Sequence, residues 1–230
     1  ASPDAWCVAL QRWGTRSFAD AVAGALECAE HGFPTSAFSA SVMANNAERY
    51  QRFPTSAAIF LPGGKPHAPG QLFVQAELAA TIKEMEAAEL RAANRGRVGA
   101  IQAARDAFYK GDIARRIADY HAREGGLLVY EDLAEFHAEV APALTTTFHD
   151  YEVAACGFWC QGPVFLQMLN LIEPYDWPAL GHNTPRALHI LVEAMKLAFP
   201  DREAYYRDPR FVHVPAEALL SKAYADLRRG

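Results

Sequence analysis

Apolar and polar residues follow one another along most of the chain with the spacing of amphipathic helices. In most segments the apolar residues recur every three to four positions, which places them on one face of an α-helix. The segments predicted to be helical are residues 6–10, 18–30, 37–50, 75–94, 98–108, 113–123, 163–172, 184–205 and 219–229. A short turn or helix is expected at residues 131–133. The pattern therefore predicts a helix-rich protein.

One strong pair of strands interrupts this helical pattern. Two β-prone runs, residues 144–148 and 151–155, are separated by two polar residues and predict a hairpin with a tight turn. A glycine-containing stretch, residues 156–162, follows the second strand, and Pro163 then favours the start of a helix. The apolar residues expected to be buried on that helix are Val164, Phe165, Met168, Leu169 and Ile172. The predicted order is strand, turn, helix.

The turn at residues 156–162 has two interpretations. A turn that opens a helix leaves backbone N–H groups unpaired near Gly162, and the helix dipole adds partial positive charge there. Such a turn can hold an anion or a carboxylate, but many similar turns hold nothing. A purely structural corner is therefore favoured over an active-site lining, and Trp159 in its middle is typical of a core anchor.

The last long helix carries clear start signals. Thr184 is expected to cap it, and Pro185 occupies the first helical position. Pro200 is expected to kink or end the helix because proline lacks a backbone N–H. The residues predicted to form its buried stripe are Leu188, Leu191, Val192, Met195 and Phe199. Further back, the Pro- and Gly-rich residues 61–70 predict a surface loop without the lysine and hydroxyl spacing of a phosphate-binding loop.

Composition is ordinary for a soluble globular protein. The chain has 230 residues, 51% hydrophobic and 21% charged, which is enough for a sizeable core. The net charge is −5 and the 22 basic residues are scattered, so nucleic acid and anionic membranes are not expected as partners. No membrane-spanning stretch or signal peptide is visible, and the cytoplasm is slightly favoured over the periplasm. A first residue other than Met indicates a processed or trimmed piece.

No self-contained catalytic or metal-binding motif is present in the sequence. Four cysteines are too few for a disulfide scaffold, and the Cys156 and Cys160 pair lacks the spacing and partners of a zinc or redox site. The common hydrolase, metalloprotease, dinucleotide and calcium motifs are missing. His189 is expected to be solvated or half-buried rather than a ligand, and Glu193 and Lys196 are expected to form a surface ion pair. No metal or cofactor is predicted.

Several sequence blocks, taken in order, are more informative than any single motif. They are GGLLVYEDL (125–133), LQMLN (166–170), EAMKLAFPDR (193–202), DPRFV (208–212) and LLSKAY (219–224), preceded by AW (5–6), WGT (13–15) and AEHGFP (29–34). In this order they resemble the large-subunit signatures of γ-glutamyltranspeptidases. The resemblance covers nearly the whole chain.

The resemblance implies a fold and a mechanism. Members of that family are N-terminal-nucleophile hydrolases with an α+β fold, an αββα sandwich, and residues 1–230 would be a single domain piece of the helix-rich large subunit. The precursor cuts itself, and the new N-terminal Thr of the small subunit attacks an amide, with its own α-amine able to serve as base. An acyl-enzyme then passes its acyl group to water or to an amine.

For this chain the resemblance implies a non-catalytic half of a heterodimer. We expect no catalytic residue on it, because the nucleophile lies on the small (beta) subunit from the same precursor. The arginine that holds the substrate α-carboxylate is expected before Ala1, and the chain is expected to end near the last large-subunit helix. Asp201 and Arg202, which lie in one of the matching blocks, are expected to be paired within the subunit and to serve folding.

The chain departs from the family pattern at the turn. The family commonly has a Pro-Pro-Pro-Ser-Ser-Gly-Gly run where this chain has residues 156–162, and Gly162 is the clear match. The candidate substrate-binding residues are Trp159, Cys160, Gln161 and Gly162. The first hypothesis is a γ-glutamyl hydrolase or transferase acting on a small molecule such as glutathione. The alternatives are an acylase or amidohydrolase with another amide substrate and, in a different class, a non-catalytic helical binding module.

Overall fold

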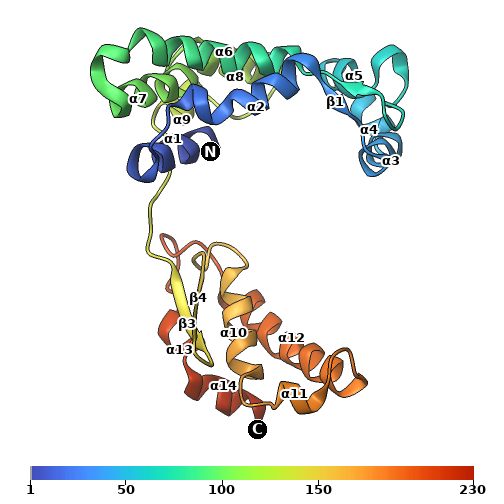
Figure 1. Cartoon of the computed structure of the whole chain (residues 1–230), viewed down its shortest axis with the longest axis vertical. Coiled ribbons are helices and arrows are strands. Elements are labelled where there is room, and N and C mark those ends of the chain that lie inside the picture. Colours follow the sequence, from blue (N-terminus) through green and yellow to red (C-terminus); the bar gives the residue numbers. More distant parts are fainter. Residues whose placement is uncertain (1) are drawn as a thin grey trace. The chain divides into compact units, whose positions relative to one another are not determined.

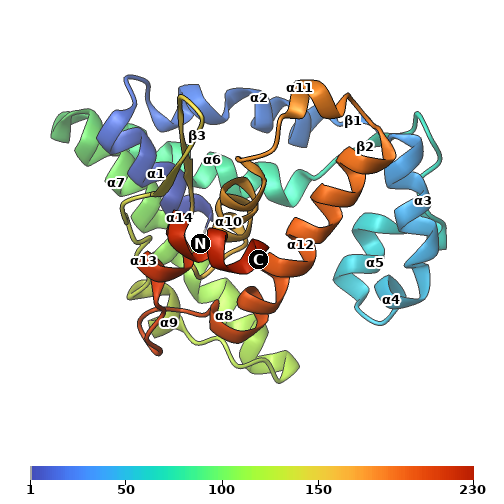
Figure 2. The same ribbon diagram turned by 90° about the horizontal axis from the view of Figure 1, so that it is seen from below.

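The computed structural model describes residues 2–230, which form two compact units. The first ends at Ala138 and the second runs from Glu139 to Gly230. Each unit has its own apolar core, and Figures 1 and 2 label the elements of both. Among residues 2–230, no helix is long and apolar enough to cross a membrane.

The first unit is almost entirely helical. Its core gathers side chains from α1, α2, α6, α7 and α8, with Cys7, Phe18 and Ile101 almost fully buried. Ser17 caps α2 in a capping box with Asp20, as the sequence predicts. The elements are α1 (Ser2–Trp13), α2 (Phe18–His31), β1 (Phe33–Pro34), α3 (Ala37–Asn45), α4 (Ala47–Gln51), α5 (Pro54–Phe60), β2 (Leu72–Phe73), α6 (Ala76–Arg91), α7 (Gly96–Tyr109), α8 (Asp112–Glu124) and α9 (Tyr130–Ala134).

A buried ion pair fixes the end of the first unit. Asp4 and Arg105 bond directly to each other, and both side chains are almost completely excluded from solvent. The Asp4 carboxylate also accepts from the Ala138 backbone N–H, and Arg105 donates to the Phe136 carbonyl oxygen. Both charges are therefore paired and hydrogen-bonded, which is what makes their burial tolerable.

The second unit packs a hairpin and several helices around α10. The strands β3 (Leu144–Phe148) and β4 (Tyr151–Ala155) pair antiparallel, with His149 at a φ of 51° in the tight turn between them. The helices are α10 (Gly162–Ile172), α11 (Trp177–Leu180), α12 (Pro185–Tyr205), α13 (Ala216–Leu219) and α14 (Lys222–Arg229). The hairpin, α12 and α14 all contact α10. The predicted hairpin and the predicted helix after it are confirmed.

The predicted buried face of α12 is wrong. The residues that α12 buries are small or polar, Ala187, Ala194, Ala198 and Asp201. Four members of the predicted stripe are instead 36–50% exposed, and Leu191 is only partly buried. The exposed four are Leu188, Val192, Met195 and Phe199. Apolar residues occur on both sides of this helix, and the alanine side is the one that lies close to α10.

The helix predicted over residues 184–205 is confirmed as α12, and of the two effects expected of Pro200, ending the helix is wrong, because α12 continues to Tyr205. Proline removes one backbone hydrogen bond, but the turn after it is held by tertiary contacts. Asp201 is buried there and accepts hydrogen bonds from α10 and α14. Tertiary contacts therefore outweigh the local signal at Pro200.

Smaller differences from the sequence prediction have local causes. The helix expected at residues 37–50 is divided at Asn46 into α3 and α4. The first helix is longer than predicted, and α5, α11 and the β1–β2 pair are additional elements. On α10, Phe165 is 53% exposed rather than buried, while the polar Gln167 and Asn170 are buried because partners satisfy them.

Candidate functional site

Residues 156–162, here called the connecting turn, close tightly between β4 and α10. A Cβ built on Gly162 would fall 2.9 Å from the Ala155 Cβ and 2.9 Å from the Cys156 carbonyl oxygen. Any larger residue would push the two ends of the turn apart, so glycine is required here by close approach. The sequence predicted unpaired backbone N–H groups near Gly162. The Gly162 N–H instead donates to Cys160 Sγ over 3.5 Å.

The aromatic anchor of the connecting turn is Phe158, not Trp159. The Phe158 ring is buried and meets the Tyr206 ring edge-on, with centroids 4.8 Å apart. Trp159 is 63% exposed, so its interpretation as a core anchor is wrong. Its Nε1 would lie 3.0 Å from a Cβ on Gly157, so the absence of a side chain there leaves room for the indole.

Arg202 contacts the other side of the turn. Its Nη1 donates to Gln161 Oε1 over 3.0 Å, and its guanidinium also bonds to Glu203. The guanidinium carbon lies 4.6 Å from the centre of the Phe199 ring. Arg202 is thus paired within the chain, as the sequence predicts, and it joins α12 to the connecting turn.

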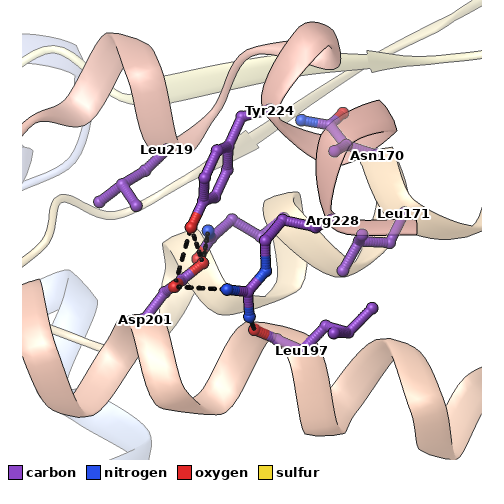
Figure 3. A pocket seen from close by; sticks show the side chains of 9 residues that line it. Asn170, Leu171, Leu197, Asp201, Leu219, Tyr224 and Arg228 are labelled. Atoms are coloured by element: carbon purple, nitrogen blue, oxygen red, sulfur yellow. Dashed lines mark hydrogen bonds and ion pairs between the residues drawn. The ribbon is translucent and has the colours of Figure 1, made fainter. Parts of the chain in front are cut away.

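Asp201 is the centre of a buried polar cluster beside the turn (Figure 3). Its Oδ2 accepts from Gln167 Nε2 at 3.0 Å, and the Tyr224 hydroxyl lies 3.0 and 3.1 Å from its two carboxylate oxygens. Arg228 Nη1 lies 3.9 Å from Oδ1, and Arg228 Nη2 donates to the Leu197 carbonyl at 2.8 Å. The predicted pairing of Asp201 within the chain is confirmed.

The cavity between these side chains is very small. It has a volume of about 10 Å³, close to what a single water molecule needs, so it is not a substrate pocket. Burial, with the Asp201 carboxylate second, raises the pKa values of both Tyr206 and Tyr224. Both phenols therefore stay protonated at neutral pH and act as donors, Tyr206 to Gln167 Oε1 and Tyr224 to Asp201.

A second polar network holds the hairpin to α10. Asn170 Oδ1 accepts from the Thr146 hydroxyl at 2.6 Å and from Lys222 Nζ at 2.7 Å. Lys222 Nζ also donates to Glu173 Oε2 at 2.7 Å, and Glu173 Oε1 accepts from the His149 backbone N–H at 2.7 Å. The β4 strand that leads into the connecting turn is thus held in place through its hairpin partner.

The polar groups of the cluster are bonded mainly to one another. In the cluster beside the connecting turn, each polar side chain named above is already bonded to another. Within residues 2–230, no group of three or more His, Cys, Asp or Glu could hold a metal ion. His189 is exposed, and Glu193 pairs with Lys196 on the helix surface, as predicted.

The four predicted substrate-binding residues lie together on the connecting turn, because they are consecutive. Trp159 and Gln161 are exposed, whereas Cys160 and Gly162 are half-buried. Gln167, which forms hydrogen bonds with both Tyr206 and Asp201, is not among the site residues predicted from the sequence. A buried glutamine on an apolar helix face is the signal that could have indicated it, since such a group needs partners.

Comparison with known proteins gives a consistent result. Residues 1–230 match the family model described as Gamma-glutamyltranspeptidase. The chain is 38% identical over 225 residues to an Acylase ACY 1 proenzyme of Pseudomonas sp. (strain SE83), covering 97% of the chain and 38% of that protein. It is 33% identical over 220 residues to the Glutathione hydrolase proenzyme of Escherichia coli (strain K12), covering 95% and 35%. The chain thus spans less than two-fifths of the length of these relatives.

Solved structures agree with the sequence comparison. The Helicobacter pylori gamma-glutamyltranspeptidase superposes with a TM-score of 0.85 at 28% identity, covering 97% of this chain and 60% of that one. A cephalosporin acylase from Bacillus halodurans superposes with a TM-score of 0.84 at 27% identity, covering 99% and 40%. The chain is therefore similar over nearly its whole length to parts of both proteins.

Proposed function

The chain belongs to the gamma-glutamyltranspeptidase family, as its ordered sequence blocks indicated, and on that premise we propose that it is the large-subunit part of an amide-cleaving enzyme. The family brings the α+β N-terminal-nucleophile hydrolase fold, of which the described residues form a helix-rich part. The proposal rests on the match of all 230 residues to one family model. The relatives of the chain named above, which are acylase and glutathione hydrolase proenzymes, agree with it.

In this proposal the chain lines part of the substrate site and does not carry the nucleophile. An N-terminal Thr of a small subunit attacks the substrate amide, the amine leaves, and water or another amine takes the acyl group from the resulting ester. The hydrogen bonds of the buried cluster in this chain support this division of roles. The Asp201 carboxylate accepts from Gln167 and from the Tyr224 hydroxyl, and the Tyr206 hydroxyl donates to Gln167. No cofactor is needed for these steps.

The proposed partner is the small subunit from the same precursor, and it packs against the outer stripe of α12. We define the outer stripe as Leu188, Val192, Met195 and Phe199, which are 36–50% exposed on a helix whose other face is buried. Large apolar residues repeated along one exposed face are typical of an interface. The relatives extend well beyond the length that this chain spans, and in this proposal their additional length corresponds to the polypeptide that covers the outer stripe.

The connecting turn is the proposed substrate-lining element, through Trp159, Cys160, Gln161 and Gly162. A γ-glutamyl group carries a free α-amine and α-carboxylate, which require hydrogen-bonding and charged partners. An exposed indole and a thiol at the centre of the turn supply apolar surface instead. The turn therefore favours a less polar acyl group than γ-glutamyl, although a γ-glutamyl hydrolase or transferase stays the alternative supported by the glutathione hydrolase relatives.

A substrate comparison on the complete, matured enzyme tests this proposal. The rates of cleavage of a γ-glutamyl anilide and of simple acyl anilides are measured for the wild type and for Trp159→Ser combined with Cys160→Ser. We expect the double variant to shift the ratio of kcat/KM towards the γ-glutamyl compound. A strong wild-type preference for the γ-glutamyl anilide that the double variant leaves unchanged would reject a specificity role for the turn. Cleavage of none of these amides would favour the non-catalytic binding module.

A further inference from the structure

The end of α12 contacts the connecting turn at two places. Arg202 donates to Gln161 Oε1 over 3.0 Å, and the Tyr206 ring packs edge-on against Phe158 at 4.8 Å. Both contacts lie beyond Pro200, the residue that was expected to kink or end the helix. The continuation of α12 past its proline is therefore what brings these two side chains to the turn.

Each of the two contacting side chains is itself held in place. Arg202 has the Phe199 ring on one side at 4.6 Å and bonds to Glu203, which leaves Nη1 directed at the turn. Tyr206 donates its hydroxyl proton to Gln167 Oε1, and the amide nitrogen of Gln167 donates to Asp201. A side chain fixed by several partners positions its neighbour better than a freely rotating one.

Phe158 and Gln161 immediately flank Trp159 and Cys160 in the sequence, one on each side. The structure therefore fixes both flanks while the indole between them stays 63% exposed. An exposed tryptophan normally has considerable freedom, but here the backbone that carries it is held at both ends. This arrangement suits a surface that must present one shape to a ligand.

We propose that Arg202 and Tyr206 are positioning residues that hold Trp159 and Cys160 against the acyl group of the substrate and so determine which acyl groups are accepted. This inference rests on the proposed function, because it needs the connecting turn to line the substrate site. Neither residue touches the reacting atoms; each acts through its neighbour on the turn. A displacement of the turn by about 1 Å is enough to alter turnover strongly.

Arg202 and Asp201 differ in burial and in hydrogen-bond partners, although the sequence predicted a folding role for both. Asp201 is 5% exposed and accepts hydrogen bonds from two other helices, so its loss damages the core of the second unit. The Arg202 side chain is 29% exposed, and among residues 2–230 its hydrogen bonds go to Glu203 and Gln161. Removing its guanidinium leaves no buried donor or acceptor without a partner, because both acceptors are exposed residues.

The test measures specificity and stability on the complete, matured enzyme for Arg202→Ala, Arg202→Lys, Tyr206→Phe and Gln161→Ala. The ratio of kcat/KM for a bulky apolar acyl anilide to that for a γ-glutamyl anilide is compared with the melting temperature. We expect Arg202→Ala to change this ratio by about tenfold or more, mainly through KM, with Arg202→Lys intermediate. Arg210→Ala is the matched control, since Arg210 is exposed and forms its ion pair with the nearby Asp208.

A double-mutant cycle with Gln161→Ala identifies the route of the effect. If Arg202 acts through Gln161, the double variant has the same specificity ratio as either single variant, whereas independent effects would multiply. The exposed Gln161 also supplies a variant that does not depend on the folding of Arg202→Ala. Effects that multiply in the double variant would overturn the inference. An active Arg202→Ala enzyme with the wild-type ratio of kcat/KM for the two anilides would also overturn it. So would an equal loss of kcat/KM for both substrates that follows the fall in melting temperature. A wild type that cleaves neither amide would instead reject the proposed function, and the inference with it.

Discussion

Gln167 on α10 donates from Nε2 to Oδ2 of Asp201 on α12 over 3.0 Å, and both side chains are buried. The same carboxylate accepts from the Tyr224 hydroxyl on α14. Three helices of the second unit are thus joined at one charged group whose burial is tolerable only while its donors remain. Tyr206, which packs against Phe158 of the connecting turn, donates to the same Gln167 and so links this junction to the turn.

Replacing Asp201 by Ala is expected to destabilise the second unit by about 2–4 kcal/mol, because the donors of Gln167 and Tyr224 lose their acceptor in the core. Asp201→Asn keeps the shape and one acceptor oxygen and is expected to cost less. Urea unfolding of the two variants and the wild type measures the difference. Equal stability of Asp201→Ala and the wild type would show that the cluster does not support the fold.

Gly162→Ala is expected to destabilise the protein by about 1–3 kcal/mol, because the new methyl group would fall 2.9 Å from both Ala155 and Cys156. The matched control is Gly24→Ala in α2, where the added methyl group would have no atom from elsewhere in residues 2–230 within 4 Å, its own helix backbone aside. Alanine in that helix is expected to raise stability by roughly 0.5–1 kcal/mol. Thermal unfolding measures both changes, and a neutral Gly162→Ala would mean that the turn is not closed as described.

Acid should weaken the attachment of the hairpin. The hydrogen bond from Lys222, followed by that from the His149 backbone, lowers the pKa of Glu173 below its ordinary value of 4.5. A carboxyl group whose pKa is lower in the folded state stabilises the protein above its unfolded-state pKa, and this stabilisation is lost as the pH falls through the folded-state value. Glu173→Gln is therefore expected to cost about 1 kcal/mol at pH 7, and the difference should shrink below pH 4.5.

The matched control for Glu173 is Glu193→Gln, which removes the exposed pair with Lys196 on the surface of α12. Exposed pairs of this kind contribute little to stability because solvent screens them. Urea unfolding at a series of pH values compares the two substitutions. A constant difference between Glu173→Gln and the wild type across that series would contradict the linkage.

In the proposed enzyme, the small subunit packs against the outer stripe of α12. Val192→Asp, placed in the complete precursor, is expected to prevent stable association of the two subunits, because it puts a charge in an apolar interface. Val98→Asp on α7 is the control, since Val98 is 52% exposed and Val192 is 50% exposed. Co-purification of the two subunits measures association. Normal assembly of Val192→Asp would place the interface elsewhere.

Features determined by neighbouring residues could be predicted from the sequence. Ser17 and Thr184 cap their helices through their own side chains, and the tight β3–β4 hairpin follows from two β-prone runs with a two-residue connection. These signals need no knowledge of the tertiary structure. The same holds for the family, whose blocks are read directly along the chain.

Features determined by distant contacts could not be predicted. Residues such as Leu188 and Ala194 lie on different sides of α12, and only the packing against α10 decides which side is buried. Phe158 and Trp159 are adjacent in an irregular turn without periodicity, so the sequence could not say which ring points to the core. The periodicity predicted the helix to residue 205, but only the contacts of Asp201 show why Pro200 does not end it.

We propose that this chain belongs to an acyl-transferring enzyme whose nucleophile lies on another polypeptide. The most direct measurement is mass spectrometry of the complete precursor after maturation, with and without a slowly hydrolysed acyl anilide. We expect two polypeptides, a transient acyl adduct on the N-terminal Thr of the smaller one, and no change in the mass of the polypeptide that contains residues 1–230. An acyl adduct on that polypeptide, or a single uncut chain that turns over the anilide, would contradict it.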